Sequence, residues 1–285
     1  MQLYALDQNL TVIHATNAKK HCDYQCLECK SFVRLRGGIH RQNHFYHVYQ
    51  TSLCKQSGKS MEHLQVQLFL QKEFDCQDLQ LEKRFNEIGR IADVVSFSKK
   101  LVFEVQCSPI SLEEVKSRNL DYQKLGLSVI WILHDKNFNK SKVSATEDFL
   151  QSTHHYFTNM DANGLGVIYD QFDLFDKGRR IFCSKPFIID VKQFLQNDFI
   201  VKNQPLPSPL LQKISSQPSF FKGDLVDYCK SEHFSENTFS QALKILESRK
   251  PKKLTIPQFL LHLLKNYLFR PYRIFLNILL EKATL

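Results

Sequence analysis

The sequence predicts an α/β protein whose central part has the element order α-β-β-β-α-β. Three observations predict it: helical periodicity in two segments, three short apolar runs between them, and one nearly all-apolar run after the second helical segment. A module rich in cysteine and histidine precedes this core. We expect a β-rich module over 1–57, an α/β domain over 58–200, a linker over 201–218 and an α-helical domain over 219–285.

The first helix of the core is expected over about 61–75. Leu64 and Leu68 recur at helical spacing, and Ser60 is a residue type that caps a first helical turn. Three short strands should follow, near 79–85, 90–97 and 101–106.

The second helix is expected to begin just after Pro109 and to end at Gly126. Ser111 and Glu114 have the spacing of a capping box, and glycine is the common residue after a helix end. The run "LSVIWILHD" that follows is short, β-branched and nearly all apolar, which is typical of a buried strand.

The segment 136–200 mixes helical and strand-like pieces to which the sequence assigns no chemistry. The linker 201–218 is rich in proline and serine, and the residues after it have helical periodicity. Within them "SRKPKK", Ser248 to Lys253, is a basic cluster that either contacts phosphates or is a solvated helix end.

The composition is that of an ordinary globular protein, with 43% hydrophobic and 24% charged residues in 285. The formal net charge of +9 favours a polyanionic partner such as nucleic acid, although a membrane surface or solubility alone would also account for it. No signal-peptide pattern is present, and no apolar run approaches about eighteen residues. We therefore expect a soluble, cytoplasmic protein without a membrane span.

Five cysteine and histidine side chains near the start of the chain are candidate metal ligands. They are Cys26, Cys29, His44, His47 and Cys54. Tetrahedral zinc takes four ligands, so one candidate is surplus. We prefer Cys26, Cys29, His47 and Cys54, with His44 as the substitute, in a zinc-ribbon-like module whose Zn²⁺ is structural. The alternative is reduced cysteines without a metal.

The run "LVFEVQ", 101–106, places Glu104 and Gln106 on one face of a strand, because residues two apart point the same way. Asp93 opposes Glu104 if Ser98 and Lys99 form a two-residue turn. Two or three converging carboxylates are what a Mg²⁺ ion needs for phosphate chemistry. The alternative for this pair is a solvated strand face.

Glu62, in the first turn of the first helix, is a candidate third carboxylate for that site. Its alternative role is the ordinary one of an acidic residue at the positive end of a helix dipole.

These motifs in this order resemble a known family. The order α-β-β-β-α-β with carboxylates on the first helix and on the second and third strands resembles the PD-(D/E)XK, or restriction-endonuclease-like, superfamily. More closely, "FEVQCSPIS", followed by Arg118, Tyr122 and "VIWIL" and preceded by "CLEC", "HFYH" and "EHL", resembles the CoiA competence protein family. The resemblance implies a role in natural transformation, on incoming DNA between uptake and recombination.

The resemblance also implies a reaction and its residues. Phosphodiester hydrolysis would depend on Mg²⁺ or Mn²⁺ held by Asp93 and Glu104, with Glu62 as a further carboxylate that holds metal or positions water. Gln106 stands where many superfamily members have lysine, and a neutral amide stabilises a developing negative charge less well than an ammonium does. The alternative function is therefore a DNA-binding or recombination-assisting protein that does not cleave.

Ser108, Arg118 and Tyr122 match the family pattern beyond the third strand, and Arg118 and Tyr122 lie one helical turn apart. The resemblance implies that they hold a phosphate of DNA, single-stranded or branched, with recombination proteins as further partners. Their alternative roles are a surface ion pair between Glu114 and Arg118 and a packed tyrosine.

Overall fold

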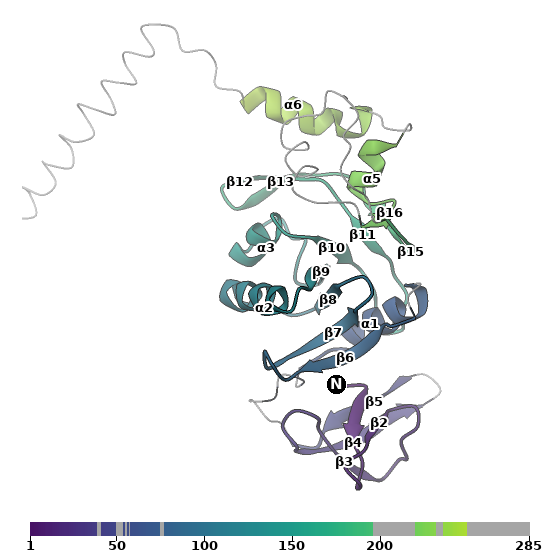
Figure 1. The fold of residues 1–285 in the computed structure, drawn as a ribbon. Coiled ribbons are helices and arrows are strands. Elements are labelled where there is room, and N and C mark those ends of the chain that lie inside the picture. Colours follow the sequence, from purple (N-terminus) through teal and green to yellow (C-terminus); the bar gives the residue numbers. More distant parts are fainter. Residues whose placement is uncertain are drawn as a thin grey trace, which may run out of the picture. The chain divides into compact units, whose positions relative to one another are not determined.

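The computed structural model describes residues 1–38, 41–49, 54, 56, 58–74, 77–195, 220–231 and 236–249 (Figure 1). The chain forms two compact units, Met1–Thr238 and Phe239–Leu285. Of the second unit the structure describes helix α6, Ser240–Arg249. The predicted linker and the end of the predicted helical domain lie outside the described residues. No helix within the described ranges is long and apolar enough to cross a membrane.

The N-terminal module is a five-stranded antiparallel sheet. In sheet order its strands are β2 (Val12–His14), β1 (Tyr4–Leu6), β3 (Asp23–Gln25), β4 (Phe32–Gly38) and β5 (Arg41–His47). Its core is small, and Cys26 and Cys54 are buried in it beside Val33 and Phe45. So small a core needs a further cross-link to hold a module together.

A seven-stranded mixed sheet forms the centre of the first unit (Figure 1). In sheet order its strands are β14 (Phe187–Ile188), β11 (Ile168–Asp170), β10 (His155–Thr158), β9 (Ser128–His134), β8 (Leu101–Gln106), β7 (Arg90–Ser96) and β6 (Gln80–Phe85). Strands β8, β9 and β10 are parallel and the other neighbours are antiparallel.

The helices follow from these pairings. Parallel neighbours require a crossover, which α2 (Leu112–Lys124) and α3 (Ala145–Leu150) provide. Helix α1 (Met61–Glu73) precedes β6, so the predicted order α-β-β-β-α-β is confirmed. Both predicted caps form as well: Ser60 Oγ accepts from the backbone N–H of His63, and Ser111 Oγ accepts from that of Glu114.

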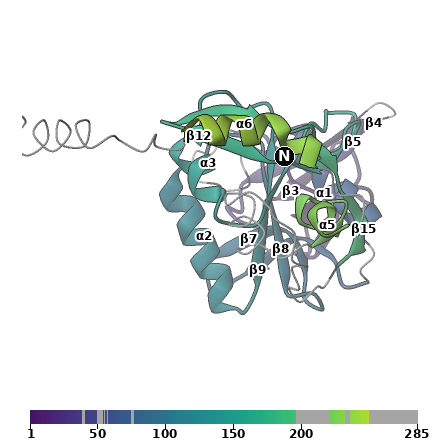
Figure 2. The same ribbon diagram turned by 90° about the horizontal axis from the view of Figure 1, so that it is seen from above.

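Helices α1 and α2 cover opposite faces of the sheet (Figure 2). Leu101 and Phe103 of β8 pack in one core cluster with Leu64 of α1, whereas Val102 packs in another with Tyr122 of α2. This is the alternation expected of a strand that is buried on both sides.

The hairpin between β7 and β8 has the predicted register. Ser96 pairs with Leu101 and Val94 with Phe103, and the backbone N–H of Lys100 donates to the carbonyl of Phe97 across the turn. Continued by one residue, this register sets Asp93 opposite Glu104. The ladder between the two strands ends there. The side chain of Asp93 accepts a backbone hydrogen bond from β8 in place of the next ladder bond.

The remaining described elements belong to the segment that the sequence left unassigned and to the start of the predicted helical domain. They are β12 (Asp173–Asp176), β13 (Arg179–Cys183), β15 (Asp190–Phe194), β16 (Phe221–Lys222), α5 (Leu225–Lys230) and the 3₁₀ helix Glu236–Phe239. β12 pairs with β13, and β15 with β16.

The first unit continues past the boundary that the sequence predicts at residue 219. Phe221 of β16 is 1% exposed and belongs to the main core, where its ring lies 5.9 Å from that of Phe74 and 6.2 Å from that of Phe103. Aromatic burial of this kind is a large contribution to a core. The residues after the linker therefore supply a strand to the α/β unit before any helical domain begins.

Candidate functional site

Four ligand-type side chains of the N-terminal module converge on one point. The ligand atoms of Cys26, Cys29, His47 and Cys54 all lie within 4.8 Å of one another. The Sγ atoms of Cys26 and Cys54 are 3.6 Å apart, and Cys29 Sγ is 3.3 Å from His47 Nε2. Tetrahedral zinc with Zn–S bonds of about 2.3 Å separates its ligands by about 3.8 Å. The donor set and its spacing fit a structural zinc ion.

The structure brings together the four ligands preferred from the sequence and leaves the substitute out. His44 is 2% exposed, and its Nδ1 lies 2.8 Å from the carbonyl oxygen of Gln42. His44 and His47 are three residues apart on β5, so their side chains leave opposite faces of the strand.

A tight turn after β3 presents the first two thiols. The backbone N–H of Lys30 donates to the carbonyl of Cys26, and that of Cys26 donates to the carbonyl of Ser31. Burial by itself raises the pKa of Cys29, but hydrogen bonds with Ser31 and His47 outweigh it and lower the pKa to about 6. A thiol that ionises this readily is ready to bind a metal, since the thiolate is the ligand.

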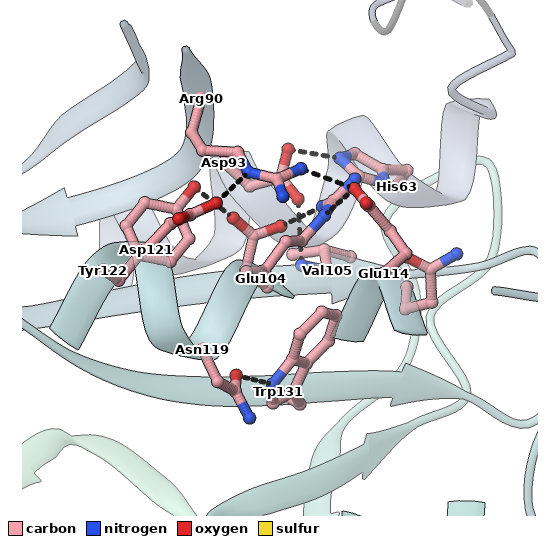
Figure 3. A network of polar contacts seen from close by, with 12 residues as sticks. His63, Arg90, Asp93, Glu104, Val105, Glu114, Asn119, Asp121, Tyr122 and Trp131 are labelled. Atoms are coloured by element: carbon pink, nitrogen blue, oxygen red, sulfur yellow. Dashed lines mark hydrogen bonds and ion pairs between the residues drawn. The ribbon is translucent and has the colours of Figure 1, made fainter. Parts of the chain in front are cut away.

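A second polar cluster lies where β7 and β8 part (Figure 3). Asp93 is its centre and is 4% exposed. Its contacts are Oδ1 with Lys59 Nζ at 2.8 Å, His63 Nε2 at 2.9 Å and Gln67 Nε2 at 2.9 Å, and Oδ2 with the backbone N–H of Val105 at 2.9 Å. This carboxylate is held by α1, by the residue before its cap, and by the neighbouring strand.

Glu104 of β8 is held from the other helix and is 1% exposed. Its Oε1 accepts from the hydroxyl of Tyr122 at 2.6 Å, and its Oε2 accepts from Nη1 of Arg118 at 2.5 Å. Arg118 also donates through Nε to Glu114 at 2.9 Å, so the predicted surface pair and a contact to the site exist together. Both residues of α2 thus bind a carboxylate of the site.

The two carboxylates differ in protonation behaviour. Burial by itself raises the pKa of Asp93, but His63 and Lys59 outweigh it and the pKa is lowered. Burial likewise raises the pKa of Glu104; Arg118 lowers it in part, the charge of Asp93 raises it, and the net direction is upward. The negative charge of Asp93 thus opposes ionisation of Glu104.

A cleft of about 220 Å³ opens beside Asp93. The segment 56–60, the first turn of α1, the ends of β7 and β8 and helix α2 line it, and its cationic lining residues are Lys59, Arg90 and Arg118. Ser108, Arg118 and Tyr122, the predicted phosphate ligands, all belong to its wall. A cleft lined by several cations suits an anionic ligand.

Gln106 also lines the cleft, and its side-chain N–H groups donate to the carbonyl and the hydroxyl of Ser108 at 2.6 and 3.2 Å. Glu62 is placed differently from the expectation. Its Oε1 lies 4.0 Å from Nζ of Lys136, and among the described residues no contact joins it to Asp93 or to Glu104. Consecutive helical residues point about 100° apart, so His63 faces the site and Glu62 does not.

Sequence reasoning missed the groups that neutralise Asp93. His63 and Gln67 are four residues apart on α1 and therefore share a face, and both are buried, so they form a polar patch on the buried face of the helix. Lys59 lies just before the cap residue and gave no signal of its own. Arg90, at the start of β7, donates to Asp121 at 2.9 Å and to Glu114 at 2.7 Å and so ties that strand to α2.

Three carboxylate oxygens of Asp93 and Glu104 keep some capacity to accept further bonds. A carboxylate oxygen accepts about two hydrogen bonds or metal bonds. Oδ2 of Asp93 and both oxygens of Glu104 each have one contact among the described residues. Two carboxylates with water and substrate oxygens are a common Mg²⁺ environment. Carboxylate oxygens of this kind are donors that Mg²⁺ or Mn²⁺ accepts.

Comparison with protein families places this cleft in a known context. The family model described as "Competence protein CoiA, nuclease-like domain" matches residues 59–208, which is more than half of the chain and includes Lys59, Asp93 and Glu104. Comparisons with curated proteins and with solved structures gave no match.

Proposed function

Since the chain belongs to the family of the CoiA nuclease-like domain, we propose that it processes DNA during competence by metal-dependent phosphodiester hydrolysis in the cleft beside Asp93. The observation that carries the proposal is a cleft lined by Asp93 and by three cations, in which two lining residues of α2, Arg118 and Tyr122, bind the buried carboxylate of Glu104. The element order also supports a restriction-endonuclease-like core.

In this proposal Asp93 and Glu104 hold the cation, which supplies Lewis-acid stabilisation of the phosphate and a more acidic bound water. Arg118 and Tyr122 hold Glu104 in place, and His63 and Gln67 hold Asp93. Gln106 and Ser108 line the cleft where a DNA strand would contact its wall. Glu62 faces Lys136 and is left out of the proposed site.

We propose unpaired DNA as the substrate. Asp93 and Glu104 are 4% and 1% exposed and lie below the protein surface. A stiff duplex keeps its phosphates on its own outer surface, whereas a single strand bends into a charged groove and follows it. A single-stranded segment, or the unpaired part of a branched molecule, is therefore expected to reach the carboxylates more readily than an intact duplex.

A specific observation favours a second function, DNA binding without cleavage. Asp93 already has an ammonium at 2.8 Å and an imidazole at 2.9 Å, and Gln106 supplies no charge to a developing phosphorane. A site neutralised in this way binds a phosphate strand even without a metal ion.

Incubation of the purified chain with single-stranded, double-stranded and branched DNA, with Mg²⁺ or Mn²⁺, separates the two functions. We expect cleavage of unpaired DNA, and a loss of about a hundredfold or more in Asp93→Asn and Glu104→Gln. Glu113→Gln is the matched control, because Glu113 is an exposed carboxylate at the start of α2. Tight binding by the wild-type chain without cleavage in either metal would establish the second function instead.

A further inference from the structure

Lys59 is the lysine whose ammonium contacts Asp93. Its ammonium lies 2.8 Å from Oδ1 of Asp93 and 3.2 Å from Oε1 of Glu82, and its side chain is 11% exposed. It also lines the cleft. A lysine this well buried is retained only where partners compensate its desolvation, which the two carboxylates do here.

The ammonium keeps one donor for a ligand. It has three N–H groups, and two of them are used by Asp93 and Glu82 in the described part of the chain. The other cations of the cleft are more fully engaged: Arg90 donates to two carboxylates and to the hydroxyl of Ser117, and Arg118 to two carboxylates.

The position of Lys59 complements that of Gln106. Both line the same cleft, Lys59 from the segment before α1 and Gln106 from the end of β8. Gln106 contributes a neutral amide that is already bonded to Ser108. The charge that position 106 lacks is therefore supplied to the cleft from another element.

The segment before Lys59 is bonded to the N-terminal module. The segment follows Cys54, a member of the metal-ligand group, and the backbone N–H of Gln56 donates to Oε2 of Glu28, which lies between Cys26 and Cys29. At the other end Glu82 binds the ammonium through Oε1 and accepts from the backbone N–H of Leu3 through Oε2. Glu28 of the N-terminal module thus binds the segment before Lys59, and Leu3 of the same module binds the β6 carboxylate that pairs with Lys59.

We propose that Lys59 contacts the phosphate of the DNA strand bound in this cleft and stabilises the negative charge that develops on it, in place of a lysine at position 106. The role in the reaction rests on the proposed function, but the contact with the phosphate does not. Lys59 therefore joins the site from the segment between the N-terminal module and α1.

Two measurements test the contact. Binding of a fluorescein-labelled oligothymidylate is measured over a series of KCl concentrations, with Ca²⁺ in place of Mg²⁺. Loss of one phosphate contact lowers the slope of log K against log salt by about 0.7 for a single strand. We expect that decrease in Lys59→Met and no change in Lys124→Met, where the lysine removed is exposed and pairs with Asp121 outside the cleft.

The double variant Lys59→Met, Gln106→Lys distinguishes the proposed role from a structural one. It returns an ammonium to the cleft without rebuilding the contacts of Lys59, so we expect the slope to regain about 0.7 and the cleavage rate to rise at least tenfold from the Lys59→Met values. Lys59→Met leaves Oε1 of Glu82 buried without its ammonium partner. If that variant fails to fold, the same comparison is made in a Glu82→Gln background.

An unchanged slope in Lys59→Met, or a double variant no better than the single one, overturns the proposal. If the wild-type chain cleaves no DNA, the proposed hydrolysis fails, and the slope still decides whether Lys59 contacts the strand. If the wild-type chain cleaves and Lys59→Met cleaves equally well, the role of Lys59 fails alone.

Discussion

The hydroxyl of Tyr122 donates a hydrogen bond of 2.6 Å to Glu104, although the tyrosine is on α2 and the glutamate on β8. The ring of Tyr122 is fully buried and packs edge-on to Phe85. One residue therefore serves both the core under α2 and the orientation of a carboxylate in the site. This relationship makes the site sensitive to changes in the core.

Tyr122→Phe keeps the packed ring and removes the hydrogen bond. Because Glu104 then loses a charge-assisted partner in a buried place, we expect a decrease of about 1 to 3 kcal/mol in the free energy of unfolding. Cleavage should fall as well, since Oε1 of Glu104 is no longer held. Urea unfolding and a cleavage assay measure the two effects. Stability and cleavage both equal to the wild type would show that the bond orients nothing.

Elemental analysis should find about one zinc ion per chain. Cys29→Ser should lose the zinc and destabilise the N-terminal module, because it removes one of four converging ligands. Cys22→Ser is the matched control and should retain the metal, since Cys22 is not in the ligand group. Zinc retained in Cys29→Ser would mean that the cluster does not coordinate it.

Arg90→Lys should destabilise the chain nearly as much as Arg90→Gln, by about 2 kcal/mol. Three nitrogens of the Arg90 guanidinium reach Glu114, Ser117 and Asp121, and a single ammonium cannot span these positions. Thermal unfolding of the two variants beside the wild type is the measurement. A lysine variant as stable as the wild type would show that charge alone suffices.

The stability of the chain should depend on pH through His154. Burial lowers the pKa of His154 from 6.5 to about 4, so the folded state keeps it neutral where the unfolded state binds a proton. Protonation therefore favours the unfolded state, and stability is lost as the pH falls from 6.5 towards 4, by up to about 3 kcal/mol.

His154→Gln removes the titration and should reduce the loss of stability between pH 7 and pH 5. Urea midpoints at both pH values, for the variant and the wild type, give the difference. An equal loss in both proteins would assign the pH dependence to other groups.

The element order and the hairpin register followed from the sequence because they depend on local signals. Ser60 and Ser111 mark helix starts by their own chemistry, and two residues at the turn after Phe97 fix which strand positions oppose each other. The zinc ligands were predictable for a similar reason, since Cys26 and Cys29 occupy one turn and His47 follows from the alternation of β5.

The groups around Asp93 were not predictable, because they come from contacts distant in the sequence. Lys59 and Glu82 are 23 residues apart, and their pairing depends on how the N-terminal module packs on β6. The burial of Phe221 in the main core depends in the same way on β15, which lies before the linker. His63 and Glu62 point about 100° apart on a helix. Which of the two faces the site depends on which side of α1 packs on the sheet, and that is known only from the structure.

Asp93 is held by α1 and Glu104 by α2, from the two sides of one sheet. Neither helix alone completes the pair, so a chain in which only one layer has docked has no working centre. In the proposed function, cleavage of DNA would therefore require that both helices are packed on the sheet.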